Sequence, residues 1–338
     1  MIRNSAVTRR LLLALVGIAL IVVLVARVGL GAIARHFAGV GFEILWLAVP
    51  YVIGTAIGAV PWVWLLPEAG RPGLGGAIVS RLTASGANTL LPFFALAGEP
   101  ARLLWIKPEV RAAGTAALVV DRVIYNCASA VFLLAGVVVA LVATQMPRPV
   151  ALVAALIGVV VLLVTLGIAF AVSRYGLGAR LERFVRQRLL LGQSPAAFGA
   201  DVDRTLRGLW RGPRLRLWLG FLTHFVSRVV LGAEVYVALW VLDVPVGPAV
   251  ALVLSTVCVA TGAVGSAIPG QLGVLEGGQA LVTATLGMDP SVGISLVLLT
   301  RLRQLLFAPL TVILISTARS SERAADPDAA LVDGNRVA

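Results

Sequence analysis

Long apolar stretches separated by short polar segments run along most of this chain. Six stretches are long enough to cross a bilayer as α-helices, because about 20 apolar residues span its hydrocarbon core. The predicted spans are residues 11–28, 44–66, 112–143, 149–172, 217–242 and 292–317. The first could instead be a signal peptide cleaved near Ala32–Ala34. Its length and the apolar chain that follows favour an uncleaved span.

Two further apolar segments, residues 77–103 and 249–285, are interrupted by residues that break helices. Both place a glutamate seven residues after a proline, and a long polar side chain three residues later. The spacing occurs as Pro92, Glu99 and Arg102 in the first copy and as Pro269, Glu276 and Gln279 in the second. Further breaking residues are Asn88, Gly98, Gly270 and Gly273. Each segment is therefore predicted to be a re-entrant helical hairpin or a pair of broken helices, which in matching positions points to a transporter's binding site.

The composition supports a membrane protein rather than a soluble one. Hydrophobic residues make up 59% of the chain and charged residues only 13%, about half the charge of a soluble domain. We predict an all-α polytopic membrane protein with about six full transmembrane helices and two broken or re-entrant hairpins. Residues 1–318 should form one transmembrane domain, and residues 319–338, which lose apolar periodicity, a disordered cytoplasmic tail.

The distribution of arginine predicts the orientation. The chain has a formal net charge of +12, and the segment 174–216 between two predicted spans is strongly basic. By the positive-inside rule this segment and both termini are cytoplasmic, as in a bacterial-type inner membrane. Counting spans then makes the two hairpins enter from opposite faces, as an inverted repeat. Apolar residues at helical spacing from Leu177 to Leu189 suggest an interfacial helix, although a solvated linker fits equally well.

Charged or titratable side chains fall within the apolar segments, where each costs roughly 2.5–3.5 kcal/mol on insertion scales. The expected substrate-binding or translocation residues are Glu99, Arg102, Asp121, Arg122, Arg228, Glu276, Arg301 and Arg303. His224 and Glu234 could relay protons.

Spacing suggests how some of these charges pair. Glu99 and Arg102 share a helical face. The expected long-range pairs are Glu276 with Arg301 or Arg303, and Asp121 with Arg102. Such pairs could be salt bridges that only fix helix register. Arginines outnumber carboxylates, however, which leaves positive charge for an anionic ligand, and the planar fork of arginine suits phosphate.

Several kinds of chemistry have no legible motif. The chain has no GxxxxGK[ST] loop and no Ser/His/Asp constellation, and two histidines without a ligand cluster make a metal site unexpected. We therefore expect no catalytic residues, no cofactor and no nucleic-acid partner, and an enzyme is the minority interpretation.

The motifs resemble a known family. The runs around Pro92, Gly98-Glu99 and Arg102, followed by Asp121-Arg122, are similar to early blocks of the lysylphosphatidylglycerol synthase/flippase transmembrane family. The runs around Pro269 and Glu276-Gly-Gly, followed by Arg301-Leu-Arg303, are similar to its later blocks and to its hopanoid-associated branch. The resemblance implies a lipid translocation module over most of residues 1–320, without the aminoacyl-transferase domain of the synthases.

The expected function is therefore that of an inner-membrane lipid flippase or transporter. The resemblance leaves the substrate open among anionic or aminoacylated phospholipids, hopanoids and polyprenyl-linked lipids. The expected partners are membrane lipids and lipid-biosynthesis enzymes. The alternatives are a non-transporting scaffold subunit of a lipid-biosynthesis complex and a membrane-embedded lipid-modifying enzyme.

Overall fold

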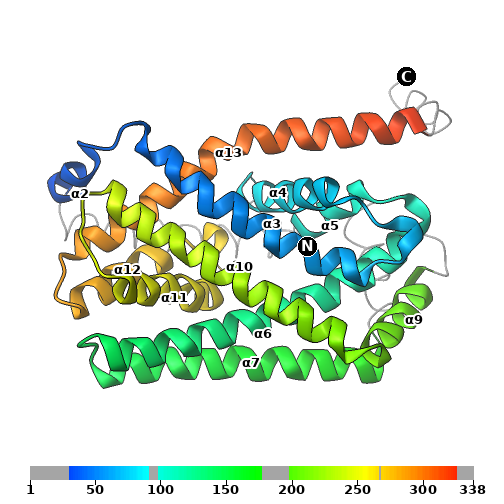
Figure 1. Cartoon of the computed structure of the whole chain (residues 1–338), viewed down its shortest axis with the longest axis horizontal. Helices are drawn as coiled ribbons and strands as arrows, with labels where there is room; N and C mark the ends of the chain where they lie inside the picture. The colour runs from blue at the N-terminus through cyan, green and yellow to red at the C-terminus, as the bar shows by residue number, and fades with distance from the viewer. Residues whose placement is uncertain (1–29, 91–97, 177–197, 266–267, 326–338) are drawn as a thin grey trace, which may run out of the picture.

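A computed structural model describes residues 30–90, 98–176, 198–265 and 268–325 (Figure 1). All regular secondary structure in these ranges is helical. In chain order the elements are α2 (Leu30–Phe37), η1 (Phe42–Leu47), α3 (Ala48–Leu65), η2 (Glu68–Gly70), α4 (Leu74–Leu90), α5 (Gly98–Ala101), η3 (Arg102–Trp105), η4 (Pro108–Val110), α6 (Arg111–Ala143), α7 (Arg148–Tyr175), α9 (Phe198–Arg211), α10 (Arg214–Val241), α11 (Pro248–Val264), η6 (Pro269–Gln271), α12 (Val274–Thr285) and α13 (Pro290–Ala325).

Five helical segments in the described ranges are long and apolar enough to cross a membrane. They are Phe42–Leu65, Arg111–Ala143, Arg148–Tyr175, Arg214–Val241 and Pro290–Phe307. Each coincides with a predicted span. The predicted span 11–28 lies outside the described residues. Many large apolar side chains on these helices are exposed, α7 above all, as expected where lipid rather than water surrounds the protein. The chain is thus a multi-pass membrane protein.

Close packing of small residues joins α3 to α10. A Cβ added at Gly54 would lie 2.7 Å from Cγ of Leu231, and one at Gly58 would lie 2.9 Å from Oγ of Ser227. The Ser227 hydroxyl also donates to the Gly54 carbonyl at 2.7 Å. Small residues spaced four apart let membrane helices approach in this way. The same α10 packs against α6, which lies beside α7 along one edge of the molecule (Figure 1).

In both interrupted segments, the helix that follows the break packs on the helix that precedes it. α11 is followed by a break and then by α12, which packs back on α11. α4 is followed, beyond residues 91–97, by α5, which packs back on α4. Glycine is required at this second return, since a Cβ on Gly98 would lie 2.0 Å from the Ala84 carbonyl oxygen. We call these two units hairpin 1 (α4–α5) and hairpin 2 (α11–α12).

The long helix α13 connects the two hairpins. It packs against α12 and also against α4, and it contains Pro309. Its last turns continue to Ala325, past the predicted start of the disordered tail at residue 319. Apolar periodicity stops near residue 319, but Arg, Ser, Glu and Ala there are compatible with a helix. The domain boundary near residue 319 stays a prediction. Residues 326–338 lie outside the described part.

The basic segment 174–216 is not a loop throughout. Residues 198–211 form α9, whose buried side chains Val202 and Leu206 pack against α6. The stretch from Leu177 to Leu189, predicted as an interfacial helix, lies outside the described residues.

Candidate functional site

In hairpin 2, Glu276 sits in the first turn of the returning helix α12. Its Oε2 accepts a hydrogen bond of 2.8 Å from the Gly273 backbone N–H, so the carboxylate caps the helix. Its Oε1 accepts one of 2.8 Å from Nε of Arg301 on α13. Arg301 Nη2 in turn donates to the Gly270 carbonyl at 3.1 Å. One arginine thus holds both the carboxylate and the backbone of the break.

The break in hairpin 2 depends on glycine. Gly270 and Gly273 have φ values of 62° and 78°, a left-handed conformation that side chains with a Cβ rarely adopt. Pro269 begins the short helix η6 between α11 and α12. The three residues predicted to break this helix therefore all lie within the break.

Hairpin 1 has a matching arrangement. Glu99 sits in the first turn of the returning helix α5, and the Gly98 N–H donates to Oδ1 of Asn88 at 2.9 Å across the break. Glu99 pairs with Arg102 at 3.3 Å and with Arg122 at 3.4 Å. Pro92 lies outside the described residues. In both hairpins the glutamate thus starts the returning helix and faces an arginine.

A buried ion cluster surrounds Asp121 on α6. Arg102 Nη1 donates to Asp121 Oδ2 at 3.0 Å, and His224 Nε2 lies 2.8 Å from Asp121 Oδ1. The Arg102 side chain has no exposed surface and its guanidinium lies 4.4 Å from the centre of the Trp62 ring. Its Nε and Nη2 lack a hydrogen-bond partner in the described part of the chain. The attraction of the indole face for a cation offsets part of that loss.

Next to this cluster, three guanidinium groups gather around Tyr125. Arg81 on α4, Arg122 on α6 and Arg228 on α10 lie 5.3, 5.1 and 4.4 Å from the centre of the Tyr125 ring. Arg228 donates to Ser129 Oγ at 2.8 Å and to the Tyr125 hydroxyl. Arg81 also reaches Asp121 Oδ2 at 3.8 Å. We call Arg81, Arg122, Arg228 and Tyr125 the arginine cage.

A further buried pair lies between α10 and α13. Arg303 Nε donates to Glu234 Oε1 at 2.6 Å, and the Arg303 guanidinium lies 3.8 Å from the centre of the Tyr51 ring. Glu234 and His224, the two residues proposed to relay protons, therefore belong to separate clusters, although both lie on α10. The proton-relay role stays a prediction.

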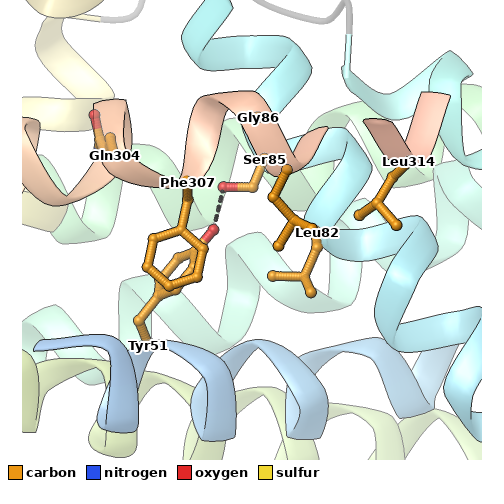
Figure 2. Close-up of a pocket in the computed structure, with 8 residues that line it drawn as sticks. Tyr51, Leu82, Ser85, Gly86, Gln304, Phe307 and Leu314 are labelled. Atoms are coloured by element: carbon orange, nitrogen blue, oxygen red, sulfur yellow. Dashed lines mark hydrogen bonds between the residues drawn. The ribbon is translucent and has the colours of Figure 1, made fainter. Parts of the chain in front are cut away.

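A small cavity lies at the junction of α3, α4 and α13 (Figure 2). The Tyr51 hydroxyl donates to Ser85 Oγ at 2.8 Å, and the Tyr51 ring meets Phe307 edge-on at 5.5 Å between centroids. Leu82 and Leu314 close its other side (Figure 2). Tyr51 thus touches hairpin 1 through Ser85 and Arg303 of α13 through its ring.

The structure brings together both expected long-range pairs, Glu276 with Arg301 and Asp121 with Arg102. Of the two arginines considered for Glu276, Arg303 pairs with Glu234 instead. The reason is helical geometry: positions 301 and 303 point about 200° apart on α13. The substrate-binding roles of these residues are not settled by the pairing and remain a proposal.

Sequence reasoning missed Arg81, Tyr125 and Tyr51. Arg81 was detectable, because it is a charge inside the interrupted segment 77–103. Tyr125 follows Asp121 by four positions and Arg122 by three, so it shares their side of α6. Tyr51 gave no signal, since a tyrosine in an apolar helix is ordinary. Among the described residues, no group of three His, Cys, Asp or Glu side chains could hold a metal ion.

These features define a multi-pass helical membrane protein with two broken-helix hairpins and ion pairs buried between its spans. A family model described as the lysylphosphatidylglycerol synthase TM region matches residues 10–311. The chain belongs to this family, and membership points to a lipid-related function. No curated protein and no solved structure matches it.

Proposed function

We propose that this protein is a lipid transporter that moves an amphiphilic lipid between the leaflets of the inner membrane. The observation that carries the proposal is the pair of matched hairpins, in which a glutamate starts the returning helix and binds an arginine. Transporters place polar, discontinuous helices at membrane depth where they line a substrate path.

In the proposed mechanism the lipid headgroup enters the polar region beside hairpin 1 while its tails stay in the bilayer. The hairpins form an inverted repeat, one accessible from each face. α13 packs on both hairpins, so a movement of one hairpin can be transmitted to the other. Such a movement would separate α3, α4 and α13 at the contacts of Tyr51 with Ser85 and Phe307 (Figure 2).

The proposal assigns both termini and the basic segment 174–216 to the cytoplasmic side. It assigns no catalytic step and no cofactor to the chain. Its partners are membrane lipids and, through them, the enzymes that make or use those lipids. Movement is downhill, or coupled to protons through Asp121 and His224.

The test is reconstitution of the purified chain in vesicles that carry labelled anionic phospholipids, aminoacylated phospholipids, hopanoids or polyprenyl-linked lipids. The proposal expects at least one lipid to change leaflets much faster than in protein-free vesicles. A scaffold subunit would move none of them. A lipid-modifying enzyme would produce a new lipid species, which mass spectrometry of the same vesicles would detect. Either result contradicts the proposal.

A further inference from the structure

A recess lies at the end of the candidate span Arg214–Val241, where α10 stops. Its volume is about 420 Å³, and it is lined by Tyr236, Trp240, Asp243, Val244, Pro245 and Val246. α9 lies at the opposite end of α10 (Figure 1). Trp240 follows Arg228 by 12 positions, so about 18 Å of helix separates the recess from the arginine cage. The recess is therefore distinct from the site described above.

Two aromatic side chains form one wall of the recess. Tyr236 and Trp240 are four residues apart on α10, so their side chains share one face of the helix. Tyr236 is 46% exposed and Trp240 is 59% exposed, which leaves both rings open to a ligand. Such rings near the end of a span often serve only to anchor it in the membrane interface. An anchoring role does not account for the carboxylate that lies beside them.

Asp243 is unfavourable for the helix that it ends. Its φ is 55°, in the left-handed region where helix ends usually place glycine or asparagine. Its negative charge lies next to the C-terminus of α10, where the helix dipole favours cations, and the last turn of α10 contains no basic residue. Among the residues that the structure describes, no basic side chain pairs with this carboxylate.

All three features of the recess attract a positive charge. The faces of the Tyr236 and Trp240 rings attract cations, and quaternary ammonium groups are the organic cations that aromatic sites bind best. The Asp243 carboxylate and the negative end of α10 add to this attraction. A small metal ion needs several oxygen ligands, whereas the only carboxylate that lines the recess is that of Asp243. An organic cation is the ligand that fits this combination, and the volume is within the range of small-molecule sites.

We propose that this recess binds a quaternary ammonium group at the membrane surface. The group is held between the rings of Tyr236 and Trp240 and the carboxylate of Asp243. The site is separate from the hairpins, and it does not depend on the proposed transport of lipid. A soluble cation and the headgroup of a lipid both supply this chemistry, and the test distinguishes them.

The test is a binding titration of the full chain in neutral detergent by isothermal calorimetry. The probes are choline and 3,3-dimethylbutan-1-ol, an uncharged analogue of the same shape. Choline should bind saturably, and the uncharged analogue at least tenfold more weakly. Asp243→Asn and Trp240→Leu should each weaken choline binding about fivefold or more, because each removes one source of attraction for the cation. Two exposed residues outside the recess supply matched controls, and Glu68→Gln and Trp218→Leu should bind choline like the parent.

A lipid that carries the same group identifies the source of the ligand. Dihexanoylphosphatidylcholine is titrated in the same way, and only binding that is lost in Asp243→Asn is counted. Binding tighter than that of choline supports the site with a lipid headgroup as its ligand. Binding equal to or weaker than that of choline supports the site with a soluble cation as its ligand.

A melting experiment separates a binding role from a structural one. Without ligand, Asp243→Asn should melt at or above the parent's temperature, because asparagine adopts the left-handed conformation and carries no charge. A clear fall in melting temperature would show that Asp243 serves the fold and would overturn the inference. Equal choline binding by the parent and by Asp243→Asn, or equal binding of choline and its uncharged analogue, would also overturn it. Neither result bears on lipid movement in vesicles, which tests the proposed function separately.

Discussion

Arg301 on α13 donates hydrogen bonds from one guanidinium to both the Glu276 carboxylate and the Gly270 carbonyl of hairpin 2. Arg301→Ala should leave the Glu276 carboxylate, whose side chain is only 2% exposed, with its helix cap but without a cation. We expect a loss of about 3 kcal/mol in the free energy of unfolding, measured by thermal or denaturant unfolding in detergent. The double variant Glu276→Gln, Arg301→Gln should recover part of the loss. A double variant no better than the sum of its single changes would contradict the pairing.

Asp121 and Glu99 both bind Arg102, but the two carboxylates differ in burial. Asp121 is 2% exposed and also binds His224, whereas Glu99 is 19% exposed. Asp121→Asn should therefore destabilise the protein more than Glu99→Gln, by about 2 kcal/mol, because a fully buried guanidinium loses its main counter-charge. Melting temperatures of the two variants in the same detergent make the comparison. Equal losses would mean that Asp121 is not the principal partner of Arg102.

The return of α5 against α4 should not tolerate a methyl group at Gly98. A Cβ on Gly98 would lie 2.0 Å from the carbonyl oxygen of Ala84 on α4. A Cβ on Gly75, which also lies on α4, would meet no atom within 4 Å. Gly98→Ala should cost about 1–3 kcal/mol through overpacking. Gly75→Ala should be neutral or slightly stabilising. A Gly98→Ala variant as stable as Gly75→Ala would show that hairpin 1 does not fold back as described.

Asp289 lies directly before α13 and outside the membrane-spanning segment Pro290–Phe307. It should make the free energy of unfolding depend on pH. Its carboxylate accepts a hydrogen bond of 2.8 Å from the Ser291 backbone N–H. This bond is the main reason that the pKa of Asp289 lies below its ordinary value, and a hydrogen bond with the Ser291 side chain is the second reason. A lowered folded pKa means that the stabilisation is present above the unfolded pKa of about 4 and is lost as pH falls through the folded value. Asp289→Ala should lower the melting temperature at pH 7, a cap being worth about 1 kcal/mol. The difference from the parent should shrink in strong acid, and a difference independent of pH would contradict the cap.

The features that could be predicted from the sequence are those that depend on residues close together in the chain. The spacing of Pro92, Glu99, Pro269 and Glu276 predicted two breaks, because proline, glycine and buried charge act on the local backbone. Pairing of Glu276 with an arginine of the last span was predictable in kind, since a buried carboxylate needs a cation.

The choice of partner was not predictable in the same way. Whether Arg301 or Arg303 meets Glu276 depends on the rotation of α13 about its axis, which packing between helices fixes. The gathering of Arg81 and Arg228 around Tyr125 depends on three helices that lie far apart in sequence. Tertiary packing, rather than local preference, decides both.

The central claim, that the chain moves lipid between leaflets, is tested most directly by the rate at which reconstituted protein exposes a labelled inner-leaflet lipid. The rate with the parent protein should far exceed the rate in protein-free vesicles. Arg207 on α9 is exposed, and the control variant Arg207→Gln should match the parent's rate. Glu276→Gln, reconstituted to the same level and shown to be folded, should fall close to the protein-free rate. A parent rate equal to that of protein-free vesicles, or a Glu276→Gln rate equal to the parent's, would contradict the account.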